Sequence, residues 1–210
     1  MPAALTPTSY AILGLLALRP WTTYELAQQM DRALGRFWPR AESRIYEEPK
    51  KLVAHGLARA TTEMVGKRRR TIYAITANGR RALEQWIPTP GEGPVVEFEQ
   101  LIKVFFAEHA TKADLLATLA GTQAWSAAQL GASAGIPKAY LADSGPFPER
   151  LPWIVLVGQF LTDHYLMVER WAEWAQGVVE TWPDDLADAP ADRAALERQA
   201  AVTEARADAS

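Results

Sequence analysis

The sequence predicts a mainly α-helical protein in two parts: a unit of three helices with a two-stranded β-ribbon, then a unit of helices alone. Apolar residues recur at helical spacing through most of the chain. Two segments of alternating apolar residues flank a basic turn within residues 57–76. A segment at 88–94 with three prolines and two glycines separates the two parts and is expected to be a linker or sharp corner.

The first two helices are predicted at residues 8–18 and directly after Thr22. The segment Arg19-Pro20-Trp21 ends the first helix. Thr22 or Thr23 can cap the second, and Thr22 has Glu25 three residues later, which fits a capping box. The apolar face of this second helix is expected to consist of Tyr24, Leu26, Ala27 and Met30.

A third helix is predicted at residues 41–56, after Pro39 and with Gly56 as the C-terminal cap. Pro49 falls inside this range. A proline in a helix interior removes a backbone donor and clashes with the carbonyl four residues earlier, at a cost of about 3 kcal/mol. The third helix is therefore expected to be kinked between Ile45 and Pro49.

Two strands are predicted at residues 57–64 and 70–76, with Tyr73 and Ile75 on the inward face. Thr76 can then cap a fourth helix at 77–87. A helix followed by a ribbon with four adjacent cations at its tip has the layout of a winged helix-turn-helix. In such a module the helix faces base edges in the major groove, and the ribbon contacts phosphates.

Sequence-dependent binding to double-stranded DNA is therefore the first functional hypothesis. Arg and Lys in the N-terminal half of a recognition helix reach guanine acceptors, and Ser reaches either kind of group. Adjacent cations repel one another, and a polyanion relieves that repulsion. The residues predicted to contact DNA are Thr23, Tyr24, Ser43, Arg44, Tyr46, Lys50, Lys51, Lys67, Arg68, Arg69 and Arg70. The alternative is a solvated helix face with Glu42, Glu47 and Glu48, and an ordinary soluble hairpin turn.

The charge distribution favours the DNA hypothesis. Residues 1–90 contain 14 Lys and Arg against 7 Asp and Glu, whereas residues 91–210 contain 8 against 18, which yields the net charge of −3. A basic half joined to an acidic half is typical of a nucleic-acid module attached to another module. A helical protein-interaction or small-molecule-binding module remains the alternative, but it has no need of an excess of seven cations.

The C-terminal part is predicted to contain helices at 95–110, 111–135 and 151–182, with a proline-rich loop at 137–152. The last residues lack aromatic side chains and are rich in Ala, Asp, Glu and Arg, so they are expected to be frayed helix or disordered. The expected domains are a winged helix-turn-helix over 1–88, a helical dimerisation and effector domain over 95–182, and a tail over 183–210.

The long helix at 151–182 is expected to form the dimer. Its apolar positions alternate spacings of three and four residues, which is a heptad seam. The seam runs through Ile154, Val157, Leu161, His164, Val168, Trp171, Ala175, Val178 and Trp182, and all of these except Ala175 and Trp182 are taken as dimerisation residues. The alternative is a buried helix of one monomer, which Trp153, Phe160, Tyr165 and Trp174 would fit. Both can hold on different faces. Two-fold symmetry predicts a palindromic operator.

Five of the eight tryptophans lie in the C-terminal half. Rings in such number usually fill cores and interfaces. The functional alternative is a flat apolar slot between protomers that stacks a small planar effector. The residues assigned to such a slot are Trp153, His164, Trp171 and Trp174.

The sequence offers no pattern for catalysis, metal or cofactor binding. It has no cysteine, and its three histidines show no metal-ligand spacing. Glycine-rich phosphate loops and the nucleophile elbow are also missing. The N-terminus has no basic region before its apolar stretch, and no run reaches the ~18 uninterrupted apolar residues of a membrane span. The expectation is a soluble cytoplasmic protein that is not an enzyme.

Residues 5–87 resemble the PadR family of bacterial transcriptional regulators. The resemblance is carried by TPTSYAILGLLAL, TTYELAQQM, SRIYEEPKKLVAHGL, the basic wing and IYAITANGRRALEQWI, and the helical remainder is similar in layout to that family's dimerisation region. Pro49 departs from the pattern, since a leucine is usual there. The resemblance implies a homodimeric repressor whose DNA affinity changes with a small aromatic or other effector.

Overall fold

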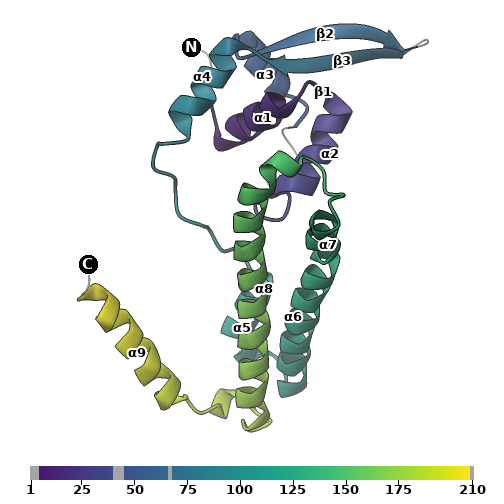
Figure 1. Ribbon diagram of the computed structural model, residues 1–210. Coiled ribbons are helices and arrows are strands. Elements are labelled where there is room, and N and C mark those ends of the chain that lie inside the picture. Colours follow the sequence, from purple (N-terminus) through teal and green to yellow (C-terminus); the bar gives the residue numbers. More distant parts are fainter. Residues whose placement is uncertain (1–4, 40–44, 66–67, 209–210) are drawn as a thin grey trace. The chain divides into compact units, whose positions relative to one another are not determined.

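The structure of the protein is a computed structural model that describes residues 5–39, 45–65 and 68–208. The chain divides into two compact units, Met1–Pro94 and Val95–Ser210. Residues 90–98, which include most of the Pro- and Gly-rich segment, form neither helix nor strand. The mainly α-helical fold with a β-ribbon in the first unit is confirmed (Figure 1).

Helix α1 (Pro7–Leu18) lies at the centre of the N-terminal unit. Thr6 caps it in a capping box with Ser9, and Ile12, Leu13 and Leu16 are fully buried. Around it pack α2 (Thr23–Leu34), α3 (Glu48–Ala54), β3 (Arg68–Ile75) and α4 (Ala77–Trp86) (Figure 1). The first helix was predicted to begin at residue 8, one residue later than observed, and Pro7 occupies its first turn, where proline is tolerated.

The β-ribbon consists of β2 (Ala58–Val65) and β3, paired antiparallel along their whole length. A third strand, β1 (Trp21–Thr22), pairs with the other edge of β3, so the sheet order is β1-β3-β2. Two residues are too few to show alternation, and the sequence therefore predicted a two-stranded wing. Trp21 is buried in this strand and donates its indole N–H to the carbonyl of Leu15, 2.8 Å away.

The capping box predicted for α2 is confirmed. Thr22 is the N-cap, and its hydroxyl and the carboxylate of Glu25 bond reciprocally to the two backbone amides. Leu26 and Met30 face the core as expected. Tyr24 was wrongly assigned to the apolar face, because its side chain is 67% exposed. It lies in the first turn of α2, on the side of the helix that faces solvent, whereas Leu26 in the next turn is fully buried.

The predicted kink at Pro49 is wrong. Helix α3 begins at Glu48, so Pro49 occupies the first turn, where its missing N–H has no helical partner to lose. Its ring is fully buried. The predicted cap at Gly56 is confirmed by its φ of 70°, a left-handed conformation that glycine adopts without strain. The amides of Gly56 and Leu57 bond to the carbonyls of Val53 and Leu52, as in a Schellman motif.

Helix α4 is capped by Thr76, as predicted, and packs closely on the start of the ribbon. A Cβ placed on Gly79 would lie 2.1 Å from the carbonyl oxygen of Leu57, so only glycine permits this approach. At the other end of α4, Trp86 stacks on Tyr10 of α1 with ring centroids 4.6 Å apart. These two contacts join α4 to both the ribbon and the central helix.

The C-terminal unit is built on two long helices, α6 (Lys112–Ser133) and α8 (Leu151–Glu180), which pack along each other (Figure 1). Before α6 come the short helices α5 (Glu99–Phe105) and η2 (Ala107–His109). Between α6 and α8 lie α7 (Gly135–Leu141) and η3 (Pro148–Arg150). The loop predicted at 137–152 is therefore partly helical, because Pro137 falls in the first turn of α7, where proline is tolerated.

The core of this unit joins α6 to the C-terminal half of α8. Leu115 and Leu119 of α6 cluster with Ala175 and Val179 of α8. Higher along the pair, the buried hydroxyl of Ser126 donates to the carbonyl of Tyr165 at 2.6 Å. Lys112 donates to the carbonyls of residues 180 and 182 at the end of α8, which satisfies two acceptors left free by the helix terminus.

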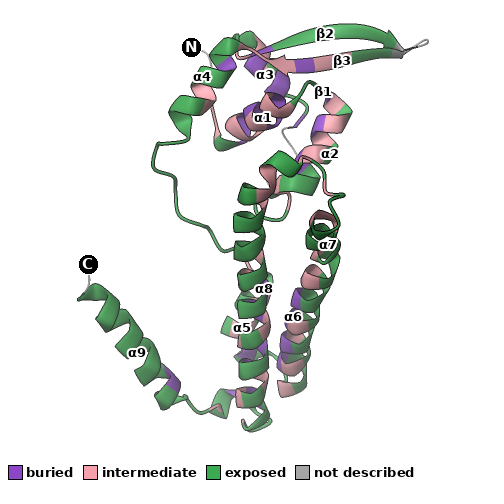
Figure 2. Cartoon of the chain, in the orientation of Figure 1, coloured by how far each residue is buried: buried purple, intermediate pink, exposed green. Residues whose placement is uncertain are grey.

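The tail expected to be frayed or disordered contains η4 (Leu186–Asp188) and α9 (Arg193–Ala207). Leu186 joins the core, and Asp192 caps α9 by accepting from the amide of Ala195 at 2.9 Å. Residues 193–207 are helical, in agreement with the frayed-helix alternative, and almost all of α9 is exposed (Figure 2). An alanine-rich composition favours helix even where no apolar face is buried.

The helical segment Pro148–Glu180 is long and apolar enough, by length and composition, to cross a membrane. This helix has no uninterrupted apolar run of the length of a membrane span, because charged residues are interspersed among its apolar ones. Much of its apolar surface is exposed within the single chain (Figure 2). A long helix that pairs with another protein chain satisfies the same criteria.

Candidate functional site

The N-terminal turn of α2 presents two of the residues predicted to contact DNA. Thr23 is the first residue of the helix and is half-buried, whereas Tyr24 projects into solvent. The phenol oxygen of Tyr24 accepts a hydrogen bond from the side-chain amide of Gln28, one turn later, at 2.9 Å. The phenol therefore has a fixed direction and retains its own O–H as a donor.

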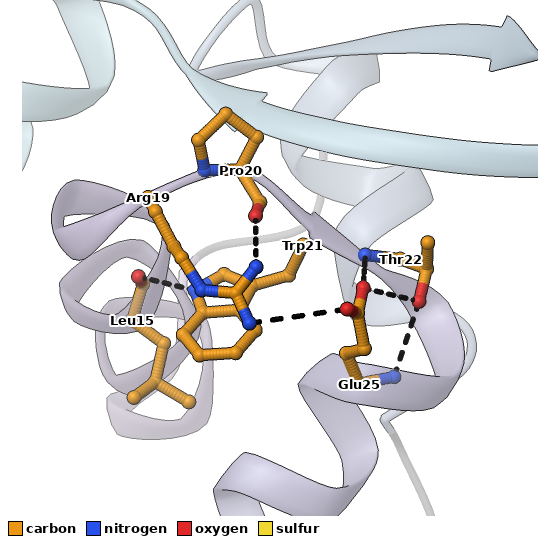
Figure 3. Close-up of polar contacts among 6 residues, drawn as sticks. All are labelled: Leu15, Arg19, Pro20, Trp21, Thr22 and Glu25. Carbon is orange, nitrogen blue, oxygen red and sulfur yellow. Dashed lines mark hydrogen bonds and ion pairs between the residues drawn. The ribbon is translucent and has the colours of Figure 1, made fainter. Parts of the chain in front are cut away.

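A compact set of polar contacts holds this turn in place (Figure 3). The Arg19 guanidinium lies over the Trp21 ring, 3.5 Å from the ring centroid, and 3.8 Å from Glu25 Oε1. The other carboxylate oxygen of Glu25 accepts from the Thr22 amide at 2.9 Å and from the Thr22 hydroxyl at 2.7 Å. The end of α1, the strand β1 and the start of α2 are joined through these groups.

The charge of the wing also acts on Glu25. The hydroxyl and amide of Thr22 are the main reasons that the pKa of Glu25 lies below its ordinary value, and the positive charges of Arg19 and Arg70 lower that pKa further. Arg70 belongs to β3, so the basic strand lies close enough to the first turn of α2 for its charge to act there.

Helix α3 and the turn before it carry three more predicted contact residues. Tyr46 is 58% exposed, and Lys50 is exposed, while Lys51 is half-buried. Each lysine pairs with a glutamate three residues earlier: Lys50 Nζ lies 2.9 Å from Glu47 Oε1, and Lys51 Nζ lies 3.5 Å from Glu48 Oε1. Glu47 is the main reason that the pKa of Lys50 is raised.

The wing supplies the remaining cations. Arg69 and Arg70 are exposed in β3, where they stand opposite Met64 and Glu63 of β2. The backbone of Arg68 begins β3. Ser43, Arg44 and Lys67, which were also predicted to contact DNA, lie outside the described residues. The sequence predicted the ribbon correctly. That Glu63 stands opposite Arg70 follows from the register of the two strands, which the structure shows.

Sequence reasoning overlooked the environment of Glu48. Its position between charged neighbours suggested a solvated helix face, yet the side chain is buried. Charge alternation along a helix does not reveal which acidic residue has a buried partner. The only usable signal was Pro49, whose placement in a first turn would have moved the helix start to Glu48.

The predicted dimerisation residues divide between two faces of α8. Val168 is only 5% exposed and packs within its own chain, so its assignment to a partner contact is wrong. Ile154, Leu161, His164, Trp171 and Val178 are half-buried, and Val157 is exposed. The exposed apolar stripe instead contains Trp153, Phe160, Met167 and Trp174. The monomer-core alternative is therefore wrong for Trp153, Phe160 and Trp174, and right for Tyr165, which is buried.

This stripe, here called the outer seam, is defined by residues 153, 157, 160, 164, 167, 171, 174 and 178. Successive positions of the outer seam are alternately four and three residues apart, so it is a heptad seam. It shares residues 157, 164, 171 and 178 with the predicted seam, and its other positions each lie one residue before the predicted ones. The inner face of α8, with Tyr165, Val168, Ala172, Ala175 and Val179, is buried within the chain. Because α6 packs along α8, Val168 and Ala175 of the predicted seam are buried, whereas Met167 and Trp174 of the outer seam remain exposed.

The four residues assigned to an effector slot do not meet within one chain. Trp153 and Trp171 are eighteen residues apart on one straight helix, or ~27 Å at 1.5 Å per residue. Trp171 packs against Phe98, with ring centroids 6.2 Å apart, and Phe98 also contacts Trp125. His164 stacks on Phe160 at 6.5 Å. Trp174 lines a separate open cavity of about 510 Å³ with Val178, Trp182 and Pro190.

Within residues 5–39, 45–65 and 68–208, no three His, Asp or Glu side chains gather in a way that could hold a metal ion. In this part of the chain none of the buried side-chain N or O atoms lacks a hydrogen bond.

Comparison with known proteins finds a family match within the N-terminal unit. Residues 12–85 match the transcriptional regulator PadR-like family. The negative transcriptional regulator PadR of Bacillus subtilis is 33% identical over 102 residues, which cover 46% of this chain and 54% of that protein. This chain thus aligns with about half the length of that relative. The probable transcriptional regulator Rv1176c of Mycobacterium tuberculosis is 29% identical over 191 residues, or 86% of this chain and 95% of that protein.

Solved structures share the fold across both units. Bacillus subtilis PadR in complex with operator DNA superposes with a TM-score of 0.70 at 22% identity, over 81% of this chain and 98% of that one. The same Bacillus protein in complex with p-coumaric acid superposes with a TM-score of 0.63 at 23% identity, over 84% and 99%. These similarities show the fold of the winged helix and of the helical unit.

The contacts of Glu25 predict a pH dependence of stability. Because the folded pKa is lowered below the ordinary 4.5, the Glu25 carboxylate stabilises the fold above pH 4.5, and this contribution is lost as the pH falls through the folded pKa. Glu25→Gln should reduce the free energy of unfolding by about 0.5–2 kcal/mol at neutral pH, the range for losing a helix cap.

Urea unfolding at a series of pH values tests this. The difference between wild type and Glu25→Gln should shrink as the pH falls below 4.5. Glu84→Gln changes an exposed glutamate on α4 and should follow the wild-type profile. A difference between wild type and Glu25→Gln that stays constant down to acid pH would show that the charge of Glu25 contributes nothing.

Proposed function

Because residues 12–85 match the transcriptional regulator PadR-like family, we propose that the protein is a DNA-binding transcriptional regulator. The observation that carries the proposal is that the matched residues form a winged helix that exposes Tyr24, Tyr46, Lys50, Arg69 and Arg70. Residues 1–90 hold the whole cationic excess of the chain. The function requires no catalytic step, and we assign the protein no enzymatic activity.

In the proposed complex, α3 enters the major groove and the wing contacts the sugar-phosphate backbone. Arg69 and Arg70, with Lys67 and Arg68, supply the phosphate contacts of the wing. The phenol O–H groups of Tyr24 and Tyr46 are neutral donors to phosphate oxygens. Lys50, together with Ser43 and Arg44, reads base edges. DNA contact by either lysine of α3 requires it to leave its glutamate partner or to bridge glutamate and DNA through its remaining donors.

We further propose that two protomers associate through the outer seam of α8. Its exposed tryptophans, phenylalanine and methionine form an apolar stripe along a 30-residue helix, which a monomer leaves in water. Pairing of two such stripes would cover them and would present two winged helices to a palindromic site. The same pairing accounts for the apolar character of α8 in a cytoplasmic protein, and recovery of the protein in a washed membrane fraction would contradict it.

We propose that the regulator is a repressor controlled by a small aromatic effector. The relative from Bacillus subtilis is named a negative regulator, and its structure has been solved with p-coumaric acid. In this chain the aromatic side chains of Phe98, Trp125 and Trp171 form a cluster that can accept a planar ring, in which Phe98 and Trp171 are half-buried and Trp125 is 39% exposed. Binding there would act only if the ligand favours one placement of the two winged helices over another.

The wing makes a prediction about salt. If each protomer neutralises three or four phosphates, a dimer has a Z of about 6–8, and log K against log salt should have a slope of roughly −5 to −7. Replacing Lys67, Arg68, Arg69 and Arg70 with Ala should flatten that slope and weaken binding to all sequences similarly. The control replaces four cations of the C-terminal unit, namely Lys138, Arg193, Arg198 and Arg206. Equal changes in both variants would remove the wing from the interface.

The outer seam makes a prediction about oligomeric state. Phe160→Glu places a charge in the seam at a side chain that is 59% exposed, so the isolated chain should fold while the dimer dissociates. Gln159→Glu makes a similar change at the neighbouring exposed position outside the seam and should leave the dimer intact. Light scattering after size exclusion measures the mass. A dimeric Phe160→Glu protein would place the interface elsewhere.

The aromatic cluster makes a prediction about ligands. Planar aromatic acids such as p-coumaric acid should quench tryptophan fluorescence and lower the affinity for operator DNA, and Trp171→Ala should remove both effects. If no compound of this class changes the fluorescence or the DNA affinity of the wild type, the cluster is packing alone, and the repressor is controlled by its own concentration.

A further inference from the structure

Glu48 is a charged residue buried at the start of the recognition helix. Its side chain is among the least exposed charged groups of the described chain, with a residue exposure of 6%. The hydroxyl of Ser9, thirty-nine residues earlier in α1, donates to Glu48 Oε2 at 2.6 Å. The ammonium of Lys51 lies 3.5 Å from the other oxygen, Oε1. Both carboxylate oxygens therefore have partners, one from α1 and one from α3.

Ser9 is itself held by the cap of α1. Its hydroxyl accepts from the amide of Thr6 at 3.0 Å while it donates to Glu48, and Ser9 is fully buried. One residue earlier, Thr8 accepts from the indole N–H of Trp38 at 3.0 Å. Trp38 follows α2, and Glu48 begins α3. The first turn of α1 thus holds the chain both after α2 and at the start of α3.

This contact takes the place of a local cap. Helix α3 has only seven residues, and no side chain caps its N-terminus. A short helix of this kind has little stability of its own and depends on tertiary contacts for its position. A charge-assisted hydrogen bond has a narrow range of length and direction, and removal of one partner of a buried charge leaves the other uncompensated. The Ser9–Glu48 hydrogen bond therefore restricts the position of the first turn of α3 more than the helix itself does.

We propose that Glu48 is a positioning residue for DNA sequence recognition, because its buried bond to Ser9 fixes the first turn of α3 on α1 and so aims Tyr46 and Lys50. The proposal rests on the DNA-binding function proposed above. Glu48 contacts no base itself. Its loss degrades discrimination between DNA sequences, whereas the general attraction to phosphates is retained.

The neighbouring residue supplies a matched control. Glu47 also pairs with a lysine three residues later, at 2.9 Å, but its side chain is 77% exposed and it has no contact with α1 among the hydrogen bonds and ion pairs of the described residues. Removal of either negative charge should, by electrostatics alone, strengthen binding to every DNA sequence. The positioning role predicts the opposite sign for Glu48 on a preferred site.

The experiment compares wild type, Glu47→Gln and Glu48→Gln on a site selected by the wild type from randomised duplexes and on an unrelated duplex of equal length. Glu47→Gln should raise both affinities by a similar factor. Glu48→Gln should lower the ratio of the two affinities about tenfold, the loss expected when one base contact is misaligned. An unchanged ratio in Glu48→Gln would overturn the proposal.

Two further measurements keep the test decisive if Glu48→Gln folds poorly. Ser9→Ala retains the charge of Glu48 and should lower the same ratio, while the double variant should lose no more than either single variant. Additive losses would show that Ser9 and Glu48 act separately and would overturn the proposal. Hydrogen exchange without DNA should be faster in α3 and unchanged in α2 for Ser9→Ala, and unchanged exchange in α3 would also overturn it. A wild type without any preferred site would instead contradict the DNA-binding function.

Discussion

Burial of α1 is the constraint on which the N-terminal unit depends. This helix is apolar around most of its circumference, so no single neighbour can cover it, and four elements pack against it. Each fully buried side chain such as Ile12 or Leu16 contributes about 1.5–3 kcal/mol relative to exposure. Because α3 and β3 share this support, the recognition helix and the wing belong to one rigid frame. Apolar packing does not by itself fix the orientation of the elements around α1. The hydrogen bonds that Thr8 and Ser9 make in the first turn of α1 do so, because they are directional.

The helix α8 shows how one apolar helix can serve two partners. Its inner face packs on α6, and the outer seam lies on an adjacent face of the same helix. Both faces follow a spacing of three and four residues, but they have no residue in common. A helix used only within its chain would expose polar residues beside the inner face. Here the adjacent face exposes Trp153, Phe160 and Trp174 instead, which is why we assign it to a second chain.

Local patterns in the sequence predicted the parts of the fold that local chemistry determines. Thr22 with Glu25, Gly56 and Thr76 marked helix ends correctly, because a cap requires particular side chains at fixed positions. The start of α3 was missed, since Pro49 is compatible with either a kinked interior or a first turn, and only the packing of its ring decides. The register of α8 was missed by one residue at alternate positions for the same reason. Of the candidate site, the ribbon and its cations were predicted, whereas the exposure of Tyr24 was not, and the buried partner of Glu48 arises from a contact between residues far apart in sequence.

The pairing of charges within the N-terminal unit separates two tasks. On α3 each lysine has a glutamate at the preceding turn, so the helix brings little net positive charge to the groove. The wing has four adjacent cations in its sequence and a single acidic residue, Glu63, opposite Arg70 in the paired strand. General attraction to DNA therefore comes mainly from the wing. A recognition helix close to neutrality gains less from any phosphate it meets, so its binding energy depends more on the fit of its side chains to base edges. Accurate placement of a short, nearly neutral helix is then the physical requirement for specificity, and the buried contact between α1 and α3 is positioned to meet it.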